Sequence, residues 1–112
     1  MDMRERVVDG VTVLDLSGKI VLGEGDVQIK GRIKELLGEG QKRILLNLAD
    51  VSYMDSAGLG SLISSYATVK REGGQLRLEH VTARVQDLLT ITKLITVFEA
   101  FDDEKEALAA FN

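Results

Sequence analysis

The order of hydrophobic and polar residues changes its period several times along the chain, and each change predicts a new element. Residues 3–8 and 11–17 have the length and composition of two strands. The Asp9-Gly10 dipeptide between them is typical of a tight hairpin turn, because both residues tolerate positive φ. From Asp26 the period becomes that of a helix, which is predicted to end at Gly38 and to bury one stripe of side chains: Ile29, Ile33, Leu36 and Leu37.

The rest of the chain is predicted to alternate strands and helices. Residues 43–48 form the most apolar short run, which is typical of a central strand buried on both faces and parallel to a neighbour. An apolar stripe that begins at Leu59 predicts a helix ending at Gly73-Gly74. The next elements are a strand that includes Leu76 and Leu78, a short helix with an apolar stripe of Val85, Leu88 and Leu89, and a strand over residues 97–101. The last element is a helix that begins with a capping box of Asp103 and Glu106. It is predicted to face the core with Ala107, Leu108 and Phe111.

This order of elements predicts an α/β fold. Two strands come first, and strands then alternate with helices, so that crossover connections join neighbouring parallel strands. We expect one domain over residues 1–112, with a mostly parallel central sheet of about five strands and about four helices. The opening hairpin is the antiparallel exception. A chain of 112 residues is long enough to bury a core of its own.

The charge balance and the residue types exclude several classes of site. Lys and Arg number 14 against 18 Asp and Glu, and neither half of the chain is basic, so no nucleic-acid partner is expected. The chain has no Cys and a single His, which leaves no thiolate or His-based metal site, and we expect no metal. Two isolated GxG pairs, at Gly23 and at Gly58, do not extend into a phosphate-binding loop, so no cofactor is expected.

Neither catalysis nor a membrane location is indicated. His80 ends a predicted strand and has no Ser or Asp at the spacing of a nucleophile motif, so we expect a protein that is not an enzyme. Every apolar run is far shorter than the roughly 20 residues that span a bilayer, which predicts no direct membrane insertion. The charged start of the sequence does not resemble a secretory signal, and we expect a cytoplasmic protein.

The segment from Tyr53 to Gly60 is the strongest candidate for function. It follows the central strand and opens the next helix, and in α/β sheets function gathers at this end of a strand. Either Ser56 or Asp55 can serve as the N-cap of that helix, and a cap alone is the simplest reading of Ser56. The first turn is otherwise small (Ala57, Gly58 and Gly60), which lets another protein or a phosphate approach closely, and its one large apolar residue, Leu59, is either core or an exposed anchor.

The residues around this segment resemble a known signature. Asn47-Leu48 and then Val51-Ser52-Tyr53-Met54-Asp55-Ser56-Ala57-Gly58-Leu59-Gly60 resemble the signature of STAS domains, in particular of bacterial anti-sigma-factor antagonists. The resemblance covers nearly the whole chain, including the opening hairpin, the turn at Gly18, the Gly73-Gly74 break and the stretch from Leu88 to Leu94. It implies that Ser56, next to Asp55, is phosphorylated by a partner that is both an anti-sigma factor and a serine kinase.

The resemblance implies a two-state adaptor. The unphosphorylated protein binds the anti-sigma kinase and thereby frees a sigma factor, phosphorylation of Ser56 ends the complex, and a phosphoserine phosphatase restores it. A phosphate placed in an apolar contact around Leu59 and Leu22 loses its water, at a cost of about 2–5 kcal/mol or roughly 30- to 5,000-fold in affinity. The expected partner-binding residues are Leu22, Asp55, Ser56, Ala57, Gly58, Leu59 and Gly60.

Other functions of STAS domains remain open at this point. Such domains also occur in stress-signalling assemblies and as accessory subunits of lipid-transport complexes, where no phosphate on Ser56 is needed. Family members have also been linked to weak nucleotide binding, which the missing phosphate loop argues against in this chain.

Overall fold

Strands β1 (Asp2–Val8) and β2 (Val11–Ile20) form the antiparallel hairpin that the sequence predicts. Asp9 and Gly10 both have positive φ, 53° and 78°, as a tight hairpin turn requires. The computed structural model describes residues 1–111, and these residues form five strands and four helices.

The five strands of the described chain form one sheet in the order β1-β2-β3-β4-β5. Strands β3 (Arg43–Met54), β4 (Gln75–Glu79) and β5 (Ala100–Phe101) each pair in parallel with the strand before them, so β3 is the central strand with a parallel neighbour on either side. The prediction of a mostly parallel α/β sheet with one antiparallel hairpin is confirmed.

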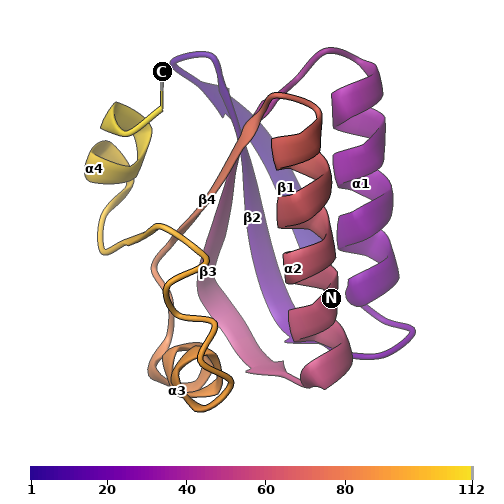
Figure 1. Cartoon of the computed structure of the whole chain (residues 1–112), viewed down its shortest axis with the longest axis vertical. Coiled ribbons are helices and arrows are strands. Elements are labelled where there is room, and N and C mark those ends of the chain that lie inside the picture. The colour runs from indigo at the N-terminus through magenta and orange to yellow at the C-terminus, as the bar shows by residue number, and fades with distance from the viewer. Residues whose placement is uncertain (112) are drawn as a thin grey trace.

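The helices cover the two faces of the sheet unequally. Helices α1 (Asp26–Gly38) and α2 (Ser56–Arg71) lie side by side on one face (Figure 1), and α3 (Ala83–Ile91) buries Val85 and Leu89 in the same core. This arrangement follows from right-handed crossovers between sequential parallel strands. On the other face, the short helix α4 (Glu104–Ala109) covers a small separate cluster of Val11, Val13, Leu45 and Ala107.

Three strands differ from the sequence prediction by three residues or more: β2, which continues past residue 17 to Ile20, and β3 and β5. The central strand continues past residue 48 to Met54, because β2 extends beside it and pairs Gly18 with Val51 and Ile20 with Met54. This extension was not predicted because its polar residues interrupt the apolar run from which the strand was inferred. The strand predicted over 97–101 contains only residues 100 and 101, because Phe98 packs its ring edge-on against Tyr66 in the core instead of joining the sheet.

Candidate functional site

Asp55 begins helix α2. Its backbone is extended, with φ −97° and ψ −177°, and its Oδ1 accepts a hydrogen bond of 2.8 Å from the amide of Gly58. This is the geometry of an N-cap, which satisfies one of the amides left free at the start of a helix. Of the two caps that the sequence allowed, Asp55 rather than Ser56 takes the role, and Ser56 becomes the first residue of the helix.

The same carboxylate holds the turn between β2 and α1. Its second oxygen, Oδ2, accepts a hydrogen bond of 3.1 Å from the amide of Leu22, and the Asp55 amide donates to the carbonyl of Ile20 at 3.3 Å. The turn is closed on itself by reciprocal backbone bonds between Val21 and Glu24, of 2.8 and 3.0 Å. Asp55 therefore fixes the position of two segments that are distant in sequence, the start of α2 and the Leu22 turn.

These hydrogen bonds explain the electrostatics of Asp55. The amide of Gly58 first, and then that of Leu22, donate to the ionised carboxylate and hold the pKa of Asp55 below its ordinary value. The carboxylate is thus negatively charged at neutral pH, directly beside the Ser56 hydroxyl in the sequence.

Glycine at position 58 is a steric requirement. A Cβ built there would lie 2.1 Å from the carbonyl oxygen of Ile20 and 2.9 Å from its carbonyl carbon, so no other residue fits without a backbone shift. Gly60 differs, because its Cβ would meet no atom within 4 Å and the residue is exposed. The first turn of α2 therefore packs against the end of β2 on one side and presents open space on the other.

The predicted site residues divide into a buried and an exposed group. Leu59 is only 4% exposed and belongs to the main core, which decides between the two roles that the sequence left open. Leu22 is 77% exposed at the tip of its turn. Ser56 and Gly60 are also exposed, and Ala57 is half-buried. The exposed members share one end of the domain because Asp55 joins the Leu22 turn to the start of α2.

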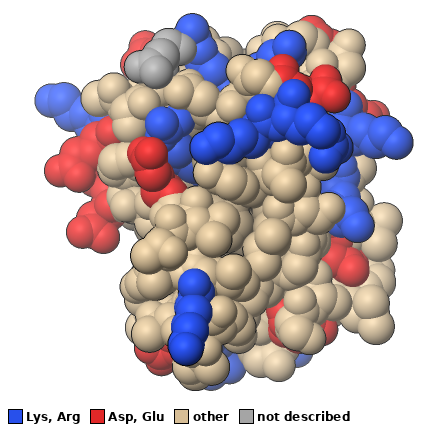
Figure 2. Space-filling model, viewed as in Figure 1, with Lys and Arg blue, Asp and Glu red and all other residues tan. Residues whose placement is uncertain are grey.

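Basic side chains are distributed unevenly over the face that carries α1 and α2, and Arg84 lies over the ring of Tyr53, three residues before Ser56. Figure 2 shows the basic side chains gathering mainly over the carboxyl-terminal ends of α1 and α2. A groove of about 470 Å³ between these helices includes Lys30, Lys34 and Arg71 in its lining, and on α2 that lining begins at Ser64, two turns beyond Ser56. A phosphate on Ser56 therefore does not enter this groove.

A second cluster of charged residues lies on the opposite face of the sheet. The Arg6 guanidinium binds both oxygens of Asp15 at 2.6 and 2.9 Å and both oxygens of Glu104 at 2.6 and 2.9 Å. Asn47 donates a further bond of 2.8 Å to Asp15, and Glu79 is fully buried beside them. These contacts tie β1, β2, β3 and the first turn of α4 together.

The sequence analysis did not identify this cluster. The signal was present, because Asp15 and Glu79 occupy inward positions of apolar strands, where a charged residue needs a partner. Which partners meet could not be predicted, since Arg6 and Glu104 are 98 residues apart.

The cluster also has the composition of a cation site. One carboxylate oxygen from each of Asp15, Glu79 and Glu104 lies within 4.8 Å of the others. The Arg6 guanidinium already binds two of these carboxylates, so a metal ion would have to displace it. We therefore interpret the cluster as an internal ion pair network.

Among residues 1–111, no helix is long and apolar enough to cross a membrane.

Comparisons with a family model and with known proteins agree on one family. The model of the STAS domain family matches residues 2–107. The anti-sigma-B factor antagonist of Bacillus subtilis (strain 168) is 37% identical over 82 residues, which cover 70% of this chain and 75% of that protein. The anti-sigma F factor antagonist of Paenibacillus polymyxa is 29% identical over 100 residues, covering 88% and 85%.

Solved structures share the fold. The Bacillus cell fate determinant SpoIIAA, solved in its phosphorylated form, superposes with a TM-score of 0.75, covering 96% of this chain and 97% of that one at 20% identity. At this level of identity the likeness concerns the fold alone.

Proposed function

Because the chain belongs to the STAS domain family, we propose that it is an anti-sigma factor antagonist switched by phosphorylation of Ser56. In its unphosphorylated form it binds an anti-sigma factor that has serine kinase activity, and the sigma factor is released. The kinase then phosphorylates Ser56 and the complex ends, until a phosphoserine phosphatase removes the phosphate. The domain itself acts by binding and has no catalytic role.

The observation that carries this proposal is that Asp55, and not Ser56, caps the helix, which leaves the Ser56 hydroxyl exposed. Asp55 provides the cap of α2, so the Ser56 hydroxyl is not needed to hold the helix. Ser56 is exposed, which leaves its hydroxyl accessible to a kinase. At the first position of a helix an added phosphate faces the positive end of the helix dipole, and the fold tolerates it.

The surface around Ser56 suits a protein partner. Leu22 is a large apolar side chain held in an exposed position by the bond from its amide to Asp55. Gly60 lies inside a helix, where glycine costs about 1 kcal/mol relative to alanine, yet a Cβ at this position would meet no atom of residues 1–111 within 4 Å. A partner backbone that packs on this turn accounts for both features.

Phosphorylation then acts at the interface and not on the fold. A phosphoserine adds a charge of about −1.5 to −2 at neutral pH, next to the ionised Asp55. Burying this charge against an apolar contact at Leu22 costs about 2–5 kcal/mol, or roughly 30- to 5,000-fold in affinity, unless the partner supplies a cation.

The proposal is tested by paired affinity capture from the source cells. One bait carries Ser56→Ala, and the other carries phosphoserine introduced at position 56 by peptide ligation. We expect the first bait to retain a protein with a serine kinase ATP site and the second to lose it. The retained protein, once purified, is expected to add one phosphate to Ser56 of the unmodified chain.

Ser64 provides the matched control, because it is an exposed serine two turns further along α2. A Ser64→Ala bait and a bait with phosphoserine at position 64 should both retain the kinase. If the two Ser56 baits capture the same proteins, the switch is wrong, and transporter or stress-complex subunits on both of them would support an accessory role instead.

A further inference from the structure

The carboxyl group of Glu79 lies in an unusual place. Asp15, Asn47 and Glu79 occupy one register position on β2, β3 and β4, so that they form a polar row across the sheet. Glu79 has no exposed surface, and neither of its carboxylate oxygens accepts a hydrogen bond from a donor in the described residues. A buried carboxylate without a hydrogen-bond donor is strongly unfavourable.

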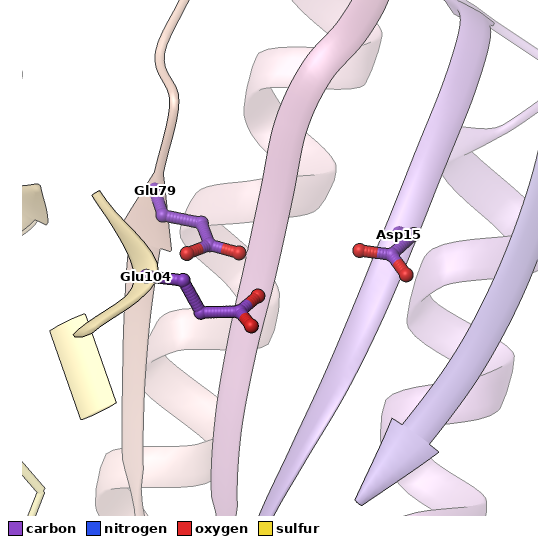
Figure 3. A group of neighbouring side chains, drawn as sticks. All are labelled: Asp15, Glu79 and Glu104. Atoms are coloured by element: carbon purple, nitrogen blue, oxygen red, sulfur yellow. The ribbon is translucent and has the colours of Figure 1, made fainter. Parts of the chain in front are cut away.

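The neighbours of Glu79 make its ionisation more costly. Figure 3 shows Glu79 and Glu104 with their carboxyl groups side by side and Asp15 facing them from β2. Arg6 is the cation of this cluster, but its donors are directed to Asp15 and Glu104. Two negative charges therefore share one positive charge before Glu79 is counted.

Other charged groups face the cluster from the surrounding strands. His80 places its Nε2 3.9 Å from Oε2 of Glu79, beyond hydrogen-bond distance. Arg77, on the same strand, uses its guanidinium on Glu99 and on the ring of Phe111. Glu79 itself is influenced by Arg6, Asp15, Glu104 and the nearby His80, while Arg4 acts on Asp15 and Arg77 is paired with Glu99.

A proton on Glu79 resolves this arrangement. The protonated carboxyl group donates to the Glu104 carboxylate, which already accepts from Arg6, and the net charge of the cluster falls from −2 to −1, with the remaining charge on the partly exposed Asp15 and Glu104. Burial first, and then the hydrogen bond with Glu104 and its negative charge, raise the pKa of Glu79 to about 8. The same hydrogen bond, together with the stronger one from Arg6, lowers the pKa of Glu104, which stays ionised.

We propose that Glu79 is a proton-dependent latch that holds β5 and α4 against the sheet. Glu79 ends β4 and pairs with Phe101 of β5, while Glu104 lies in the first turn of α4, so the shared proton joins the sheet to both elements. Loss of the proton weakens the docking of α4 and favours exposure of the apolar cluster beneath it: Val11, Val13 and Leu45. This device is independent of Ser56 and of the function proposed above.

The direction of the pH effect follows from proton linkage. When α4 is undocked, Glu79 is hydrated and titrates near its ordinary value of 4.5, whereas in the docked form it titrates near 8. Between these pH values the docked form binds one more proton than the undocked form. The equilibrium constant for undocking of α4 therefore increases by up to about tenfold for each pH unit. The contribution of Glu79 to docking is complete below pH 4.5 and is lost as the pH rises to about 8.

Two measurements on the full chain test the latch. The first is the ¹³C chemical shift of the Glu79 carboxyl carbon, which we expect to titrate near pH 8. The second is amide hydrogen exchange of residues 106–109, whose amides are hydrogen-bonded from the cap onward, between pH 5.5 and 9 and corrected for the intrinsic rate. We expect protection to fall by up to about tenfold per pH unit and to level off above pH 8.

Variants separate Glu79 from its neighbours. Glu79→Gln keeps a permanent donor toward Glu104 and should remove the pH dependence of α4. Glu106→Gln removes an exposed carboxylate from the same helix, and His80→Asn removes the nearby ring at a positive φ that asparagine tolerates, so both should keep it. Protection of α4 that stays constant with pH in the unmodified chain, or a Glu79 carboxyl group that titrates near 4.5, overturns the proposal.

Discussion

At residue 58 the helix α2 passes so close to the end of β2 that the carbonyl oxygen of Ile20 occupies the place of a side chain. Gly58→Ala puts a methyl group 2.1 Å from that oxygen, so the backbone must move apart. We expect a loss of about 3 kcal/mol in the free energy of unfolding, at the upper end for an overpacked site, because the obstacle is backbone and cannot rotate away. Urea unfolding measures this change.

Gly60→Ala is the matched substitution on the same turn. Its Cβ meets no atom within 4 Å, so alanine should stabilise the domain by up to about 1 kcal/mol through its higher helix propensity. If both variants unfold at the same urea concentration, the close approach of α2 to β2 is not rigid. The pair also separates stability from binding, because we expect Gly60→Ala to lower the affinity for the partner while it raises the free energy of unfolding.

The first turn of α2 also shows which features could be predicted from the sequence and which could not. The sequence predicted that a helix starts between Asp55 and Ser56 and that small residues line its first turn. It could not assign the cap, because aspartate and serine are about equally good caps and the choice depends on a second acceptor bond to the Leu22 amide. The burial of Leu59 likewise depends on how the helix is rotated against the sheet.

At the scale of elements, Asp55 is expected to stabilise two of them at once. Asp55→Ala leaves the amides of Gly58 and Leu22 without the acceptor that each has in the structure. We expect a lower urea midpoint and faster amide exchange at both positions, with Leu22 no longer held at the tip of its turn. The lowered pKa of Asp55 adds a pH dependence, because the bonds are complete above the ordinary value of 3.8 and weaken as the pH falls through the lowered one.

Asp103→Ala is the control for this prediction. Asp103 caps α4 in the same way, with its carboxylate accepting from the amide of Glu106 at 2.8 Å, but no bond to another segment is described for it. Its loss should speed exchange only around the start of α4. Were Asp55→Ala to affect Gly58 and leave Leu22 unchanged, the carboxylate would be a cap alone and the coupling to the turn would be wrong.

The element order and the bounds of α1 were predicted well from periodicity, whereas the lengths of β2, β3 and β5 were not. Helices α1 and α2 end at glycine-rich breaks that the sequence displays directly. The extension of β3 to Met54 depends on pairing with β2, and the shortening of β5 depends on Phe98 packing against Tyr66. Both are tertiary effects, in which a partner from elsewhere in the chain overrides the local pattern.

At the scale of the whole molecule, the two faces of the sheet are held by different forces. The face toward α1, α2 and α3 carries the large apolar core, while the face toward α4 has a small apolar cluster next to the network of Arg6. Arg6 lies on the edge strand β1 and reaches α4 near the other end of the chain. The attachment of α4 therefore depends more on charge than the packing of the other helices does.

Arg6→Gln tests this dependence across the molecule. The substitution removes the cation shared by Asp15 and Glu104, and we expect a loss of about 1 to 2 kcal/mol at pH 7, less than for a fully buried pair because the Arg6 side chain is 39% exposed. Arg6 holds the pKa values of Asp15 and Glu104 below their ordinary 3.8 and 4.5. The contribution is therefore present above those values and is lost as the pH falls.

Thermal unfolding at several pH values distinguishes charge from packing in this contribution. The difference between the unmodified chain and Arg6→Gln should be largest above pH 5 and should shrink toward pH 3, as the two carboxylates take up protons. Arg32→Gln, on the opposite face, breaks a pair with Glu5 that joins α1 to β1 and should leave α4 docked. A difference that stays constant between pH 7 and pH 3 would mean that the aliphatic stem of Arg6 stabilises the molecule by packing, and that α4 is attached by apolar contacts alone.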